Sequence, residues 1–162
     1  MTVAVRSRRA AAQSLSKQRL RLWLRLLRST RAIEGELRER LRVQFALTLP
    51  QFDVLAALAR HEAGITMTEL SRMLIVSNGN VTGIVDRLVA DRLVARQPSP
   101  NDRRSLLVRL TPKGKAEFAG AARAHEHWVD KMLSEFDGGE VETIIQHLDG
   151  LAGRVRNGGT RP

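Results

Sequence analysis

Residues 76–89, VSNGNVTGIVDRLV, combine hydrogen-bonding side chains with two glycines at helical spacing. At about 100° per residue, the apolar residues of this segment gather on one face, and Gly79 and Gly83 lie on the opposite face. Each glycine costs about 1 kcal/mol relative to alanine in a helix interior. The polar residues at the start of this helix or near its outward face are Ser77, Asn78, Asn80, Thr82, Asp86 and Arg87. The outward face is therefore bare along its centre and polar around it.

A helix face of this kind suits the edges of DNA base pairs. Glycine permits close approach of another molecule, asparagine can pair with adenine, arginine with guanine, and a threonine methyl group can contact thymine. The alternative is that the glycines are neutral at an exposed surface, since helices tolerate isolated glycines. Ser77 is most simply a helix cap worth about 1 kcal/mol, and a helix N-terminus also favours phosphate. Arg87 either pairs with Asp86 or Asp91 or reaches a phosphate.

A second cluster of candidate residues, Asp102, Arg103 and Arg104, lies between two short strand-like runs, residues 93–97 and 105–110. The residues between the runs include two prolines, an asparagine and an aspartate, which is a turn composition. The pattern predicts a two-stranded hairpin with an arginine-rich tip. The alternative reading of the tip is an ordinary charged loop.

Helices must position both clusters, and hydrophobic periodicity with capping signals predicts where they lie. Thr66 with Glu69, and Asp137 with Glu140, have the spacing of a capping box. Residues 1–15 lack periodicity and are expected to form a flexible basic arm, and residues 152–162 are expected to fray. The expected helices span residues 16–45, 50–64, 66–75, 77–91, 111–136 and 137–150.

Charge is distributed unevenly along the 162 residues, whose formal net charge is +10. Residues 1–31 contain nine Lys or Arg and no Asp or Glu, and residues 87–115 contain eight basic and two acidic residues. Residues 116–150 contain two basic and eight acidic residues. Concentrated positive charge indicates a polyanionic partner, nucleic acid before an anionic membrane surface.

Several functional classes find no support in the sequence. There is no cysteine, which excludes disulfides and thiolate chemistry. His125 and His127 are two residues apart and do not share a helix face, so we expect no metal site and no cofactor. The sequence shows no nucleophile–base pairing and no phosphate-cradling glycine loop, which argues against an enzyme. With no signal peptide and no membrane span in the sequence, we expect a cytoplasmic protein.

Residues 48–114 resemble the winged helix-turn-helix of the MarR (multiple antibiotic resistance regulator) family of transcription factors. The matching stretches are LTLPQFDVLAAL, TELSRMLIVSNGNVTGIVDRLVADRLVAR and DRRSLLVRLTPKG. The last contains the wing signature of the family as Asp102, Arg104, Leu110, Thr111 and Gly114. Two positions depart from the usual pattern, since Ile75 and Arg92 stand where glycine is common. A left-handed backbone at Arg92 would be strained.

The resemblance implies a mainly α (α+β) fold and a homodimer on a palindromic operator, with no enzymatic activity. The helices of residues 77–91 would enter successive major grooves and the wings would contact flanking minor grooves. Arg104 would probe the minor groove, Asp102 would orient it and Arg103 would contact the backbone. The implied organisation is a flexible arm (1–15), an N-terminal dimerisation helix (16–47), a DNA-binding lobe (48–111), C-terminal dimerisation helices (112–151) and a flexible tail (152–162).

The resemblance also implies a small aromatic or anionic effector that binds between the DNA-binding lobe and the dimerisation helices and releases DNA. An aromatic acid or its coenzyme A thioester would need apolar walls and a guanidinium group. The alternative role for the aromatics is packing in the dimer core, which is also the first expectation for Trp23 and Trp128. A constitutive architectural DNA-binding protein without an effector remains the alternative function. The candidate effector residues are Trp23, Leu27, Arg28, Arg31, Phe45 and Phe52.

Overall fold

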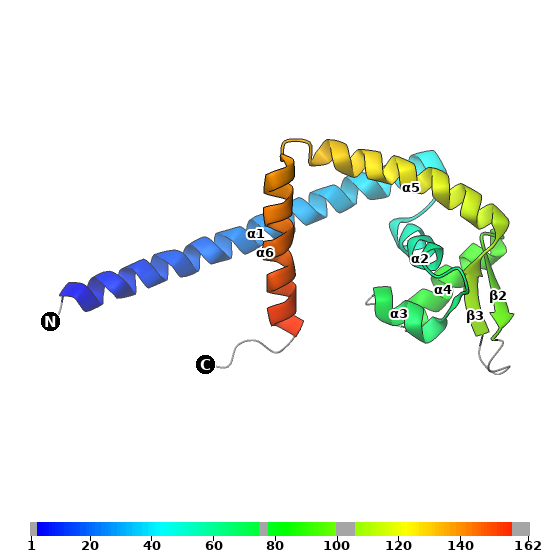
Figure 1. Ribbon diagram of the computed structural model, residues 1–162, viewed down its shortest axis with the longest axis horizontal. Helices are drawn as coiled ribbons and strands as arrows, with labels where there is room; N and C mark the ends of the chain where they lie inside the picture. The colour runs from blue at the N-terminus through cyan, green and yellow to red at the C-terminus, as the bar shows by residue number, and fades with distance from the viewer. Residues whose placement is uncertain (1–2, 75–77, 100–105, 157–162) are drawn as a thin grey trace. The chain divides into compact units, whose positions relative to one another are not determined.

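The computed structural model describes the backbone of residues 3–74, 78–99 and 106–156 (Figure 1), and the side chains of these residues from 14 onward except those of residues 78 and 156. The chain divides into two compact units, residues 1–125 and 126–162, which are treated separately below. Within the described residues, no helix is long and apolar enough to cross a membrane.

The first helix, α1 (Val3–Phe45), begins much earlier than the expected start near residue 16. The preceding residues contain alanine, arginine and glutamine but no glycine or proline. These residues are strong helix formers. The helix therefore extends through them because of their intrinsic propensity, although they show no apolar periodicity. At the other end, Leu37 and Leu41 are buried. The helix is followed by Ala46 in a left-handed conformation with φ 54°.

Three shorter helices form the centre of the first unit. Helix α2 (Leu49–Ala59) is preceded by Thr48, whose side chain and that of Gln51 form a reciprocal capping box. Helix α3 (Met67–Leu74) starts at the expected Thr66–Glu69 capping box, with the Glu69 N–H donating to Thr66 Oγ1 at 3.2 Å and the Thr66 N–H to Glu69 Oε2 at 2.8 Å. Helix α4 (Asn78–Ala90) packs against both α2 and α3.

The core of this unit confirms the expected orientation of α4. Val81, Val85 and Leu88 have no exposed surface, and they are buried together with residues of α2 and α3 such as Leu55 and Leu70. Burial of each large apolar side chain contributes roughly 1.5–3 kcal/mol. The apolar face therefore fixes α4 in the lobe and leaves its opposite face outward.

The sheet has three antiparallel strands in the order β1-β3-β2, formed by β1 (Ile65–Thr66), β2 (Val94–Pro98) and β3 (Leu106–Leu110). The hairpin of β2 and β3 was expected, whereas β1 was missed. Ile65 pairs with Val108, and a strand of two residues is too short to give a periodic signal. With α3 and α4, the sheet forms a winged helix-turn-helix.

Two helices end the chain, α5 (Pro112–Met132) and α6 (Gly138–Arg156). Helix α5 ends before the expected residue 136, and a turn leads to the predicted capping box of Asp137 and Glu140. The Glu140 N–H donates to Asp137 Oδ1 at 2.9 Å. Helix α6 continues past the expected end at Gly150, because Leu151 and Val155 extend its apolar periodicity.

Candidate nucleic-acid interface

The outward face of α4 is open to solvent along its length. Gly79, Asn80, Thr82, Gly83 and Arg87 are all exposed. Among the described residues, a Cβ atom added at Gly79 or at Gly83 would meet nothing within 4 Å. Packing against the described residues therefore requires neither glycine, and the open face leaves room for the approach of another molecule.

The bare face borders a hollow of about 370 Å³ that α4 shares with the start of α2. The hollow contains the exposed Arg87 of α4 and the Thr48–Gln51 capping box of α2. Thr48 and Gln51 were missed as neighbours of this face, although their threonine-to-glutamine spacing is a capping signal that places a helix start. The lining residues are Thr48, Gln51, Gly79, Asn80, Gly83, Ile84 and Arg87.

An ion pair connects α4 to the wing. Asp86 Oδ1 lies 2.6 Å from the guanidinium of Arg96 in β2. The sequence offered Arg87 as a partner for Asp86, but the acid pairs with Arg96 across the lobe. Arg87 forms no ion pair with either Asp86 or Asp91 in the described part of the chain. The carboxylate on the outward face is thus neutralised, and Arg87 stays available for phosphate or base.

The described part of the wing ends one residue beyond the paired strands. Pro98 pairs with Leu106, the last pair of the described hairpin. Residues 100–105 lie outside the described residues, and with them the expectations for Asp102, Arg103 and Arg104. The same holds for Ser77 and Ile75, and for the side chain of Asn78. The placement of these candidates stays a prediction.

The α4–β2 turn is locked to the start of α5, and this lock accounts for Thr111 and Gly114 of the wing signature. Thr111 Oγ1 donates to the Arg92 carbonyl at 2.7 Å, and the Gly114 N–H donates to Thr111 Oγ1 at 2.9 Å. A Cβ atom at Gly114 would lie 1.9 Å from the Leu93 carbonyl oxygen. Arg92 has φ 60°, so an arginine adopts here the left-handed conformation that glycine adopts at less cost.

The candidate effector residues fall into different environments. Trp23 is 56% exposed on α1, and Arg28 and Arg31 are exposed on the same helix. Phe45 lines two adjoining hollows of about 330 and 470 Å³ at the α1–α2 junction, which contain none of the other five candidates. Leu27 is half-buried. No single described hollow brings the six residues together.

Phe52 is a core residue, with 6% of its surface exposed. Its ring stacks on His125 at a centroid distance of 4.6 Å and lies 5.5 Å from the ring of Phe118. Burial lowers the pKa of His125, which the nearby Asp53 partly offsets, and burial raises the pKa of Asp53. These shifts favour the neutral imidazole. These contacts explain the presence of Phe52 and His125 at their positions by core packing.

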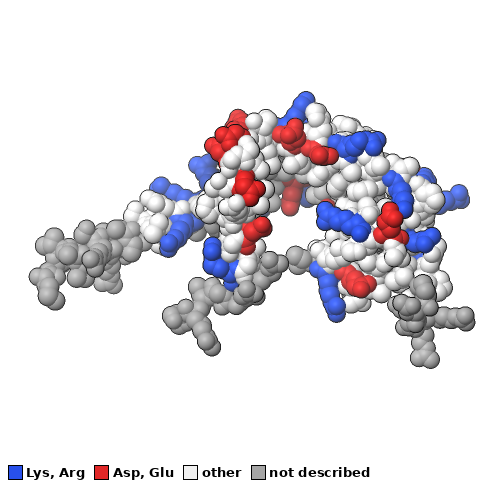
Figure 2. Space-filling model, in the orientation of Figure 1, with Lys and Arg blue, Asp and Glu red and all other residues white. Residues whose placement is uncertain are grey.

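Basic and acidic side chains are unevenly distributed over the elements. Figure 2 shows basic side chains over α1 and over the winged lobe, and acidic side chains along α6.

Trp128 of α5 is buried, with 5% of its surface exposed, in contrast to Trp23. Within the described residues there is no cluster of three or more side chains that could hold a metal ion.

Comparison with known proteins identifies relatives over most of the chain. A model of the MarR family matches residues 47–105. The transcriptional activatory protein BadR of Rhodopseudomonas palustris is 33% identical over 122 residues, which cover 74% of this chain and 65% of BadR. The HTH-type transcriptional repressor NicR of Pseudomonas putida is 31% identical over 113 residues, which cover 70% of this chain and 71% of NicR.

A solved structure gives the same similarity in three dimensions. The crystal structure of a mutant MarR from E. coli complexed with operator DNA has a TM-score of 0.66 and 30% identity, and the match covers 78% of this chain and 92% of that chain. The aligned proteins thus include an activator, a repressor and a protein solved on DNA.

Proposed function

Because the chain belongs to the MarR family of transcription regulators, we propose that it is a homodimeric, ligand-responsive repressor that binds a palindromic operator in the cytoplasm. The observation that carries the DNA-binding part is the outward face of α4. Its two glycines face open space beside Arg87, which forms no ion pair with a described residue. A helix with such a face can enter the major groove and approach the base edges closely, and the wing strands next to it are basic.

Each residue of the interface has a proposed role. Asn80 and Thr82 contact base edges or phosphate, Gly79 and Gly83 permit close approach, and Arg87 binds phosphate or guanine. Ser77 and Asn78 at the helix start contact phosphate or a base. At the wing, Arg104 enters the minor groove, oriented by Asp102, and Arg103 binds the backbone.

Exposed apolar surface supports the homodimer. The side chains of Ile145, Leu148 and Leu151 in α6 are 48%, 42% and 44% exposed, and those of Leu20 and Trp23 in α1 are 58% and 56% exposed. Exposed apolar side chains that recur along a single helix, as on each of these two helices, mark an interaction site. A two-fold symmetric dimer would place two copies of α4 on two half-sites, one helical turn of DNA apart.

The effector is the finer part of the proposal. An anionic aromatic ligand, an aromatic acid or its coenzyme A thioester, would use apolar walls and arginines drawn from Trp23, Leu27, Arg28, Arg31, Phe45 and Phe52. It releases DNA only if it prefers a dimer whose α4 helices are misplaced for successive grooves. A hundredfold loss of operator affinity requires about 2.7 kcal/mol of such preference, a usual coupling energy.

Two measurements test the proposed function. The first selects duplexes from a random pool with the full chain and then footprints the enriched site. A repressor protects a discrete palindrome, whereas protection without sequence preference would show a constitutive architectural protein instead. The second titrates aromatic acids and their coenzyme A thioesters into the protein–operator complex. If none of them releases the DNA, this ligand class is excluded.

A further inference from the structure

Helix α1 carries a stripe of basic side chains along its N-terminal half. The stripe residues follow one another at intervals of four, four and three residues, so at about 100° per residue they fall within an arc of about 80°. They are all exposed, and at 1.5 Å per residue they span about 17 Å of helix. Figure 2 shows basic side chains along the described part of α1. This basic stripe consists of Lys17, Arg21, Arg25 and Arg28.

The C-terminal half of the same helix differs, because its arginines pair with acids. Arg40 lies 2.6 Å from Glu36, and the pair is one helical turn long. Arg42 lies 2.6 Å from Glu39. By contrast, the sequence has no acidic residue before Glu34, and no described residue forms an ion pair with the basic stripe. Like charges four residues apart destabilise a helix, so an anion outside the chain would offset this repulsion.

The apolar face of this segment lies opposite the basic stripe. Leu20, Trp23 and Leu24 are exposed, and Trp23 lies about 160° around the helix from Arg21. These apolar side chains are the ones that the proposed homodimer would cover. The basic stripe would then remain on the outside of the dimer, accessible to a large partner.

The chemistry of the stripe distinguishes between possible partners. A helix that lies on a membrane buries its apolar face among the lipids, but here the dimer uses that face and only charges remain. Duplex DNA carries one negative charge per about 1.7 Å of its axis, so roughly ten phosphates accompany the length of the stripe. A row of cations without an adjoining apolar surface therefore fits a DNA backbone better than a bilayer.

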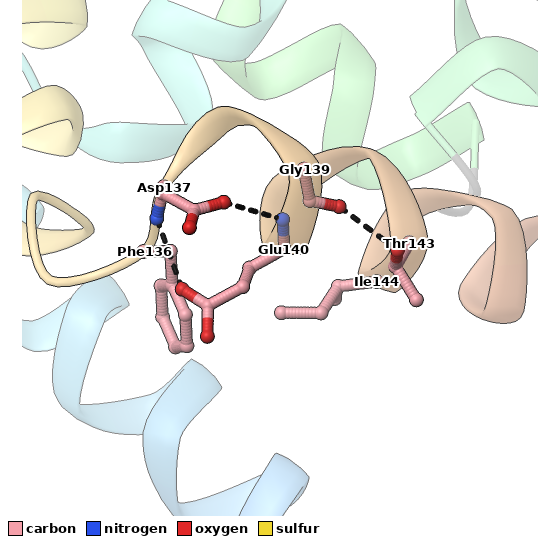
Figure 3. Close-up of a pocket in the computed structure, with 6 residues that line it drawn as sticks. All are labelled: Phe136, Asp137, Gly139, Glu140, Thr143 and Ile144. Carbon is pink, nitrogen blue, oxygen red and sulfur yellow. Dashed lines mark hydrogen bonds between the residues drawn. The ribbon is translucent and has the colours of Figure 1, made fainter.

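Acidic side chains of the chain itself are a poorer match. The acidic helix is α6, and the carboxylates of Asp137 and Glu140 at its start already accept backbone N–H groups (Figure 3). Glu142, one turn further on, accepts a hydrogen bond from Gln146 at 2.8 Å. Several acids of α6 thus have local partners, whereas every phosphate of a duplex is available to a cation.

The basic stripe is a surface of its own, separate from the α4 face. Helix α1 joins the winged lobe near Leu41, which is buried and whose carbonyl accepts a hydrogen bond from the Leu47 N–H just before α2. At 1.5 Å per residue, the stripe lies about 20–36 Å along the helix from Leu41. Several helical turns therefore separate it from the junction with the lobe.

We propose that the basic stripe of α1 binds the phosphate backbone of a second DNA duplex, so that the protein joins two DNA segments. The inference rests on the homodimer and the DNA-bound α4 of the proposed function, and adds a second DNA surface to them. Phosphate contacts carry no sequence information, so the second duplex is bound whatever its sequence. A two-fold dimer contains the stripe twice.

A capture experiment tests this second surface. Operator duplex on beads is saturated with the full chain, washed, and then incubated with a fluorescent duplex of unrelated sequence. The unchanged chain should retain the second duplex. A variant with Lys17→Gln, Arg21→Gln and Arg25→Gln should retain it about tenfold less, because three phosphate-binding charges are lost from each copy. Operator affinity of this stripe variant should not change, since α4 and the wing are intact.

A matched control removes three exposed basic side chains from α5 and α6 instead, as Arg123→Gln, Lys131→Gln and Arg154→Gln. The control and the stripe variant have the same net charge, so a difference between them reports on position. The control should retain the second duplex as the unchanged chain does. Glutamine is a good helix former, and circular dichroism checks the helix content of both variants.

The outcomes distinguish this inference from the proposed function. Operator binding without capture of the second duplex, or an equal loss in both variants, overturns the stripe and leaves the proposed function standing. If the unchanged chain binds no operator, the proposed function fails, and the affinities of the three proteins for the unrelated duplex in solution decide on the stripe. A stripe variant that self-associates more weakly, or a stripe that captures phosphatidylserine vesicles and no duplex, overturns the DNA contact.

Salt dependence supplies a measurement that needs no variant. While the operator stays bound, log K for the second duplex should fall with log salt, with a slope of about −0.9 for each stripe residue that binds phosphate. If the stripe variant unfolds, this titration decides. Capture of the second duplex that does not change with salt overturns the proposal.

Discussion

The outward face of α4 and the first turn of α5 both contain glycine, but the space around the glycines differs. At Gly79 and Gly83 an added Cβ atom would meet nothing within 4 Å in the described part of the chain. At Gly114 it would lie 1.9 Å from the Leu93 carbonyl oxygen. Gly114 is therefore required by the packing of the chain on itself. The packing of the chain on itself does not require the two glycines of α4. Substitutions at these positions can therefore test binding to a partner without disturbing the fold.

Gly114→Ala should have the largest effect on the fold. The new methyl group would force the start of α5 away from the α4–β2 turn, and overpacking of this kind costs about 3 kcal/mol when the neighbour is backbone. The free energy of unfolding, measured by urea titration, should fall by that amount. Gly35→Ala in α1 is the control, because its Cβ atom would also meet nothing within 4 Å. Equal stability of the two variants would contradict the lock at Gly114.

Gly83→Leu should leave the fold intact and remove operator binding. Leucine is a better helix former than glycine by up to about 1 kcal/mol, so the melting temperature should hold or rise. The side chain would fill the space beside Arg87, and operator affinity should fall about hundredfold, or about 2.7 kcal/mol. Gly83→Ala should give an intermediate loss in the same fluorescence anisotropy titration. Normal operator binding by the leucine variant would show that the glycines of α4 are neutral surface residues with no role in DNA binding.

Arg104→Ala tests the wing beside the α4 face. Loss of a minor-groove contact should weaken operator binding about tenfold, since a good base contact contributes roughly 1–3 kcal/mol. The slope of log K against log salt should become shallower by roughly 0.9 if one phosphate-neutralising charge is lost. The dimer should be unaffected in ultracentrifugation. Arg123→Ala, an exposed change in α5, should alter neither quantity, and matching effects of the two variants would exclude a wing-specific role.

Sequence patterns predicted the lobe and the start of α6 well because their signals are local. The apolar period of α4 fixed which face is outward, and the Thr66–Glu69 and Asp137–Glu140 boxes fixed two helix starts. The hairpin followed from its turn composition. Each of these signals lies within a few residues of the structure it determines, and burial of the α4 face confirms the first of them.

The features that the sequence did not predict depend on contacts between residues far apart in the chain or on weak local signals. Strand β1 exists through its pairing with β3, more than forty residues away. The ion pair of Asp86 with Arg96 requires the wing to fold back on α4, so a local partner, Arg87, was the natural guess. The early start of α1 at Val3 reflects propensity alone, which carries no periodic signal.

Arg92→Gly should have the smallest effect and tests the strain in the α4–β2 turn. Arg92 has φ 60°, and a left-handed residue other than glycine costs roughly 1–2 kcal/mol. Greater freedom of glycine in the unfolded chain offsets part of the relief, so the free energy of unfolding should rise by about 0.5–1 kcal/mol. Arg92→Ala is the matched control, because it removes the guanidinium but keeps the left-handed cost, and its stability should not rise. The same two variants also test a DNA contact. If both bind operator equally and more weakly than the unchanged chain, the guanidinium group of Arg92 contacts DNA.

The stability comparison decides whether the turn is strained. If the glycine variant is no more stable than the alanine variant, the left-handed backbone at residue 92, whose carbonyl accepts a hydrogen bond from Thr111, carries no strain.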